Sequence, residues 1–228
     1  MPHESRPRPW VKLCGLTRPE DAQRAIDLGA DLLGINFWPR SPRRVDLAAA
    51  REIAVLARGK ATLVGVFVNE DPTKIEARRS DIGLDLVQLH GDEPPSHRER
   101  FAQQLLQVVR ADTLGSPRDA GPAGLSLQWN VLASKSELPC LFLIDAPRDA
   151  RYGGTGEAWA WREAAAWIAA SPRPVLIAGG IRAGHAARAL AASGAAGVDV
   201  ASGVESSPGV KDAAKMRRLV EEVRGVAT

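Results

Sequence analysis

Short apolar runs recur along the chain, and between most of them apolar residues are spaced three or four positions apart. Runs of this length are typical of strands buried on both faces, whereas the wider spacing is typical of helices with one buried face. The pattern predicts eight strands. They are Val11–Cys14, Leu32–Phe37, Leu63–Val68, Asp85–His90, Leu106–Arg110, one within residues 138–145, Pro174–Ala178 and Gly197–Val200.

Helices are predicted after seven of these strands. They cover about residues 19–28, 46–58, 94–104, 159–170, 183–192 and 211–224, and one more begins at Asp71-Pro72. Thr17 with Glu20 three positions later and Pro72 after Asp71 are signals of helix starts. The stretch 112–138 is rich in Gly, Pro and Ser and holds one ambiguous segment near 125–134.

Alternating strands and helices predict parallel βα units. A count of eight favours an α/β fold of one closed (β/α)8 TIM barrel over an open doubly wound sheet. The barrel is expected to span residues 10–228, after a flexible arm over residues 1–9 in which Pro and Arg alternate. The length of 228 residues fits a compact barrel, since such barrels take about 250 residues.

Composition narrows the functional class. The net charge is +3 and the basic residues are spread along the chain, which argues against a nucleic-acid partner and suits an anionic small molecule. Two cysteines and four histidines that do not cluster in sequence predict neither disulfides nor a metal site. The sequence shows no apolar run of about 18 residues and no signal-peptide core, so we expect no membrane contact and a cytoplasmic enzyme.

Two consecutive strands end in glycine-containing turns. Gly179 and Gly180 follow the seventh predicted strand, and Ser202 and Gly203 follow the eighth. Small turns at the carboxyl ends of buried strands let backbone N–H groups approach an anion closely. Because (β/α)8 barrels commonly bind phosphate after strands seven and eight, we expect these four residues to form one phosphate site.

Two other strand ends carry candidates for acid–base chemistry. Cys14 ends the first strand and is either a thiolate nucleophile or base, or a small buried hydrophobe. Asp145 ends the sixth strand and is either an acid or base or a cap of the next turn. Partial burial is expected to raise its pKa and keep a proton available.

Further candidates lie in the loops beside these ends. Arg43 is either a planar anchor for a carboxylate or phosphate or a solvated loop charge. His90 is either a ligand contact or a hydrogen-bonded structural histidine. Gly154 lies in the Gly153–Gly156 loop, which is either a plain connection or a backbone contact to the ligand, and Trp38 offers a ring for stacking.

Taken together, these motifs resemble a known family. The matching stretches are VKLCGLT (11–17), GINFWPRSPRR (34–44), LVGVFVN (63–69), VQLHG (87–91), LIDAPRDARYGGTGEAWAW (143–161), LIAGGI (176–181) and GVDVASGVESSPGVKD (197–212). In this order they resemble the phosphoribosylanthranilate isomerases of tryptophan biosynthesis. They cover the chain from about residue 10 to its end.

The resemblance implies a single barrel without metal or organic cofactor, acting on phosphoribosylanthranilate in an Amadori rearrangement. It implies that Cys14 is the general base and Asp145 the general acid. Arg43 would bind the anthranilate carboxylate, and Gly179, Gly180, Ser202 and Gly203 the phosphate. His90 and Gly154 are expected to contact the substrate too, and the enzyme to be a monomer or a homodimer.

Arg44, Ala201 and the stretch 112–135 depart from the family pattern. The main alternatives are another phosphate-binding barrel, such as an indole-glycerol-phosphate synthase or tryptophan synthase α-type enzyme, and a non-catalytic barrel that binds a phosphorylated metabolite. The first alternative would place lysine or glutamate at strand ends. The lysines are predicted elsewhere, Lys12 inside the first strand and Lys211 and Lys215 in the last helix.

Overall fold

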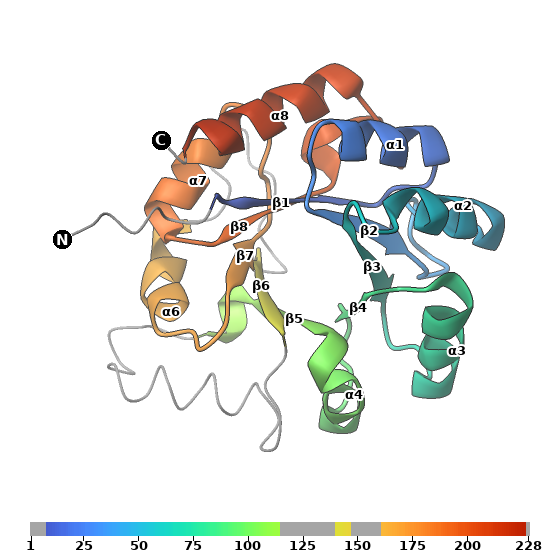
Figure 1. The fold of residues 1–228 in the computed structure, drawn as a ribbon. Coiled ribbons are helices and arrows are strands. Elements are labelled where there is room, and N and C mark those ends of the chain that lie inside the picture. Colours follow the sequence, from blue (N-terminus) through green and yellow to red (C-terminus); the bar gives the residue numbers. More distant parts are fainter. Residues whose placement is uncertain (1–7, 115–139, 147–160, 227–228) are drawn as a thin grey trace.

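The computed structural model describes residues 8–114, 140–146 and 161–226, and its strands form the predicted barrel (Figure 1). Eight parallel strands pair in chain order, and the last pairs with the first to close the sheet. The strands are β1 (Trp10–Cys14), β2 (Leu32–Asn36), β3 (Thr62–Phe67), β4 (Leu86–Leu89), β5 (Leu105–Arg110), β6 (Leu141–Asp145), β7 (Val175–Ile177) and β8 (Gly197–Val200). The (β/α)8 prediction is confirmed.

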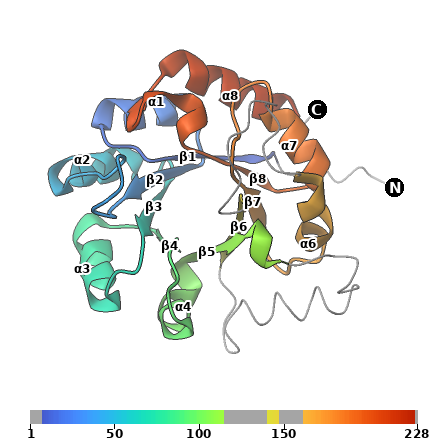
Figure 2. The same cartoon turned by 180° about the vertical axis from the view of Figure 1, so that it is seen from behind.

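The helices lie outside the ring of strands, as the two opposite views show (Figures 1 and 2). The α-helices in the described ranges are α1 (Pro19–Asp27), α2 (Leu47–Ala57), α3 (Pro72–Ile82), α4 (Pro95–Phe101), α6 (Ala165–Ala169), α7 (Ala186–Ser193) and α8 (Ala213–Gly225). Short 3-10 turns adjoin some of them, including Trp161–Ala164 before α6. Asp46, Asp71 and Asp212 cap the starts of α2, α3 and α8, because their carboxylates accept backbone N–H groups of the first turn.

Alternation along the strands divides the apolar residues into two layers. One set, which includes Leu13, Ile35 and Ile144, packs outward against the helices. The other set, which includes Val64, Leu106 and Leu143, fills the barrel interior. Successive side chains of a strand point to opposite faces of the sheet. Because all the strands are parallel, the last interior-facing residues of each strand lie together at one end of the barrel.

The end of the chain differs from the prediction. A small antiparallel hairpin, β9 (Glu205–Ser207) and β10 (Val210–Lys211), lies between β8 and α8, and the predicted break at Pro208-Gly209 is its turn. Lys211 therefore belongs to a strand and not to the last helix, which begins two residues later. The predicted segment at 125–134 and the Gly153–Gly156 loop lie outside the described residues.

No helix in the described ranges has both the length and the apolar character needed to cross a membrane. Across the same ranges, no three His, Cys, Asp or Glu side chains gather in a way that would hold a metal ion.

Candidate active site

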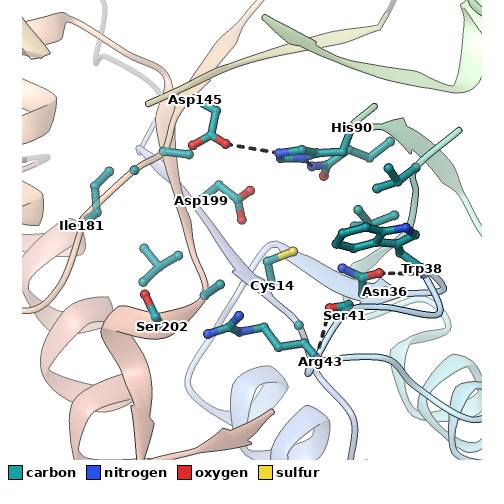
Figure 3. Close-up of a pocket in the computed structure, with 18 of the residues that line it drawn as sticks. Cys14, Asn36, Trp38, Ser41, Arg43, His90, Asp145, Ile181, Asp199 and Ser202 are labelled. Carbon is teal, nitrogen blue, oxygen red and sulfur yellow. Dashed lines mark hydrogen bonds and ion pairs between the residues drawn. The ribbon is translucent and has the colours of Figure 1, made fainter. Parts of the chain in front are cut away.

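A cavity of about 420 Å³ opens at the carboxyl ends of the strands. Most of the predicted site residues line it together. They are Cys14, Arg43, His90, Asp145, Gly179, Gly180 and Ser202. Figure 3 shows the side chains of Cys14, Arg43, His90, Asp145 and Ser202 around one space, to which they come from different strands and loops. Gly203 is not among the residues that line this cavity, and Gly154 lies outside the described residues.

Cys14 stands at the end of β1, where its side chain follows Lys12 on the interior face. Burial raises the pKa of the thiol, and the positive charge of Lys12 opposes that shift without cancelling it. The neighbouring Gly34 on β2 gives the sulfur its space, because a Cβ there would lie 2.6 Å from the Cys14 Sγ. The thiol is thus protonated at neutral pH in the free site and faces the cavity.

Asp145 ends β6 and is paired with His90, which follows β4. The His90 Nε2 lies 3.2 Å from the Asp145 Oδ2, and the Ala146 N–H donates to the Oδ1 at 2.8 Å. Burial alone would raise the pKa of Asp145, but the hydrogen bond from His90, the charge that His90 carries when protonated, the Ala146 N–H and Arg110 lower it overall. The prediction of a raised pKa is therefore wrong, because it considered burial without these partners.

Arg43 is half-buried and ion-paired. Its Nε and Nη2 donate to the two carboxylate oxygens of Glu205 at 2.8 and 2.7 Å. Lys211 donates from its Nζ to the same carboxylate at 2.9 Å. Although burial raises the pKa of Glu205, the two cations lower it overall. Glu205 thus fixes the planar fork of Arg43 at the cavity wall, and Arg43 is more than a solvated loop charge.

The two glycine-containing turns meet as predicted. Gly179 and Gly180 adopt positive φ angles of 86° and 68°, which favour glycine, and both line the cavity with Ser202. Gly203 has a packing role, because a Cβ at this position would collide with the carbonyl oxygen of Ile181. The close approach of these two loops brings the turns after β7 and β8 to one side of the cavity.

Comparison with known proteins agrees with this geometry. The family model for N-(5'-phosphoribosyl)anthranilate (PRA) isomerase matches residues 11–222. The chain belongs to this family. The family's activity, an isomerisation in tryptophan biosynthesis, is therefore the activity of this enzyme.

Individual members of the isomerase family match along nearly their whole length. The isomerase of Myxococcus xanthus is 39% identical over 216 residues, covering 95% of this chain and 96% of that protein. The crystal structure from Thermotoga maritima superposes with a TM-score of 0.78 at 31% identity, covering 95% of this chain and 98% of that one. A family structure in complex with reduced 1-(o-carboxyphenylamino)-1-deoxyribulose 5-phosphate gives a TM-score of 0.76 at 29% identity, with coverage of 95% and 98%.

A row of buried polar side chains beside the cavity was not predicted. The fully buried Lys12 donates from its Nζ to the Gln88 Oε1 at 2.7 Å and to the Asp199 Oδ2 at 2.9 Å. The Gln88 Nε2 in turn lies 2.9 Å from the His90 Nδ1. Although burial lowers the pKa of Lys12, Asp199 and Cys14 raise it overall. These contacts connect β1, β4 and β8 to the His90–Asp145 pair.

Asn36, the last residue of β2, and Trp38 also line the cavity. Asn36 was not predicted, whereas Trp38 was expected only as a ring for stacking. The Trp38 N–H donates to the Asn36 Oδ1 at 2.8 Å, which holds the loop that leads to Arg43. The signal available in the sequence was the two-residue step along a strand. Gln88 precedes His90 and Lys12 precedes Cys14 by two positions, so each pair shares the interior face.

Proposed function

We propose that this isomerase converts N-(5'-phosphoribosyl)anthranilate to the 1-deoxyribulose product with Cys14 as general base and Asp145 as general acid. The observation that carries the proposal is their placement on β1 and β6, directed into one cavity (Figure 3). An Amadori rearrangement needs a proton donor at the ring oxygen and a proton acceptor at C2′, the two atoms that flank C1′, and the cavity presents both.

In the proposed reaction Asp145 gives a proton to the ring oxygen as the bond from that oxygen to C1′ breaks. The nitrogen lone pair forms the C1′=N double bond, which yields a Schiff base. The Cys14 thiolate then takes the C2′ proton, and the electron pair of that C–H bond forms the enolamine. Loss of the 2′-hydroxyl proton and protonation of C1′ give the ketone, so substrate and product have the same atoms.

We assign the two ends of the substrate to different residues of the same cavity. Arg43, oriented by Glu205, would take the anthranilate carboxylate, because a guanidinium fork matches a carboxylate. Gly179, Gly180 and Ser202 would take the phosphate, with Gly203 holding the second turn in place. The sequence resemblance adds Gly154 as a further contact, and His90 would act beside Asp145.

The free site carries Asp145 as a carboxylate and Cys14 as a thiol, which is the reverse of what the reaction needs. The substrate brings a carboxylate and a phosphate, and nearby negative charge favours the protonated form of an acid. Binding therefore promotes proton uptake by Asp145, and the same negative charge opposes the ionisation of Cys14. Lys12, which lowers the pKa of Cys14, favours the thiolate.

The test is the fluorescence decay of freshly made phosphoribosylanthranilate with wild type, Cys14→Ala and Asp145→Ala. Each variant is expected to lose about 10²–10⁴-fold in kcat while it still binds a reduced product analogue. Cys140→Ala is the matched control, because this second cysteine only donates its S–H to the Leu105 carbonyl inside the barrel wall. Near-normal turnover in Cys14→Ala or Asp145→Ala would remove that residue from the mechanism.

A further inference from the structure

The contacts of Gln88 determine which nitrogen of His90 carries a proton. A lysine ammonium only donates hydrogen bonds, so the Gln88 atom that faces the Lys12 Nζ at 2.7 Å must be its oxygen. The other end of the same amide is then the NH₂ group, which also only donates. It lies 2.9 Å from the His90 Nδ1, and this nitrogen must therefore accept and carry no proton.

The amide of Gln88 is fixed in this orientation. A flipped amide would place its NH₂ against the Lys12 ammonium, so two donors would face each other in a buried place and this hydrogen bond would be lost whichever tautomer His90 adopts. Lys12 in turn stays charged, since Asp199 lies 2.9 Å from its Nζ and neither side chain is exposed by more than 8%. The row Asp199–Lys12–Gln88 therefore leaves His90 one site for a proton, the Nε2.

We propose that Gln88 is a positioning residue that keeps His90 neutral, with its single proton on Nε2 and directed at the Asp145 Oδ2. This inference deepens the proposed function, because it takes Asp145 as the general acid. A neutral imidazole gives Asp145 one hydrogen-bond donor. An imidazolium would add a full positive charge at 3.2 Å and hold Asp145 as a carboxylate, unable to supply a proton.

The charged and titratable groups around His90 come from several strands. Asp145 on β6, Cys14 on β1, Asp199 on β8 and Arg43 after β2 line the same cavity as His90, while Lys12 on β1 contacts its partner Gln88 and Arg110 on β5 acts on its partner Asp145. The contact with Gln88 decides which ring nitrogen carries the proton, because a proton on Nδ1 would point at the amide NH₂.

The first test is the ¹⁵N spectrum of histidine-labelled wild type at neutral pH, with the His90 signals identified by their loss in His90→Gln. We expect a pyridine-type Nδ1 and a protonated, pyrrole-type Nε2. Gln88→Glu should add a proton at Nδ1, because a carboxylate accepts from both Lys12 and a protonated Nδ1. Gln88→Met should leave a mixture of tautomers.

Activity gives the second readout. Gln88→Glu and Gln88→Met should each lower kcat by about tenfold or more, below the 10²–10⁴-fold expected for the acid itself, with little change in KM. The control is Gln107→Met, since Gln107 is another buried glutamine but lies on the outward-facing row of β5, where its Nε2 donates to the Val108 carbonyl. It should retain both the His90 spectrum and kcat.

Two results would overturn the inference. One is a wild-type His90 with a protonated Nδ1, which needs no variant to fold. The other is a Gln88→Met enzyme with the wild-type tautomer and kcat. Failure of the proposed function would give a different result. An active Asp145→Ala enzyme would exclude Asp145 as the general acid, while the His90 spectrum of the wild-type enzyme would still be the one that we predict.

Discussion

Replacement of Lys12 by Met should destabilise the barrel strongly, although the two side chains have similar volumes. Lys12 is fully buried, and its ammonium supplies the hydrogen bond that Asp199 Oδ2 receives. The other oxygen, Oδ1, is buried without a hydrogen-bond partner among the described residues. Lys12→Met therefore leaves a buried carboxylate with neither oxygen paired and Gln88 without its charged donor.

The size of the effect follows from this arrangement. Removal of one partner from a buried ion pair costs about 3–5 kcal/mol, because the remaining charge is uncompensated. For a protein of this size that corresponds to a fall in Tm of about 6–20 °C. In Lys12→Met/Asp199→Asn the carboxylate charge is gone too, so this double variant should regain about 1–3 kcal/mol relative to Lys12→Met.

The assay is urea unfolding at neutral pH, with Lys60→Met as the control at an exposed lysine that should change stability by no more than about 0.5 kcal/mol. The pKa of Lys12 is raised in the folded state, so its contribution is complete below the unfolded value of about 10.4 and is lost as pH rises through the folded pKa. Lys12→Met should lack this alkaline loss. A Lys12→Met protein within about 1 kcal/mol of wild type, or a double variant no better than the single, would refute the reasoning.

Three further predictions concern the pH profile, the space around the base and the last helix. The pKa of Asp145 is lowered and that of Cys14 is raised, so the fraction of enzyme with a protonated Asp145 and a Cys14 thiolate is constant at pH values between the two pKa values. We therefore expect kcat/KM to be flat in this range and to fall below the pKa of Asp145 and above the pKa of Cys14. A narrow bell-shaped profile would contradict this. Gly34→Ala should cut kcat by about 10²-fold by displacing the Cys14 sulfur, and unchanged turnover would show that the strand shifts instead. Asp212→Ala removes the acceptor of two N–H groups at the start of α8 and should lower the free energy of unfolding by about 1 kcal/mol, measured in urea; an unchanged value would show that the cap adds nothing.

The strands were predictable because each is buried on both faces and therefore appears as a short, mostly apolar run. Their ends agree with the structure to within a few residues, and their count led to the closed barrel. The hairpin β9–β10 was not predictable, since Glu205–Ser207 is polar and only two residues form the opposite strand. It depends on tertiary contacts, above all the ion pair of Glu205 with Arg43, 162 positions away, which local sequence does not reveal.

The positions of the cavity residues were predictable for a different reason. Parallel strands in a barrel direct their carboxyl ends to one side, so residues such as Cys14 and Asp145 had to lie near each other once the fold was known. Their electrostatics were not predictable. The pKa of Asp145 depends on His90, and that of Cys14 on Lys12, and sequence position alone does not show which side chains meet across a cavity.

The buried row of Lys12, Gln88 and Asp199 shows how far such reasoning extends. Lys12 lies 76 positions from Gln88 and 187 from Asp199, so no local spacing could pair them. Closure of the barrel pairs them, because a residue two positions before an inward-facing strand end also faces inward. In a barrel, a polar residue two positions before such a strand end is therefore buried beneath the site, where it needs a hydrogen-bond partner from another strand. The same closure that places Cys14 and His90 in the cavity thus places Lys12 where it lowers the pKa of Cys14 and Gln88 where it contacts the Nδ1 of His90.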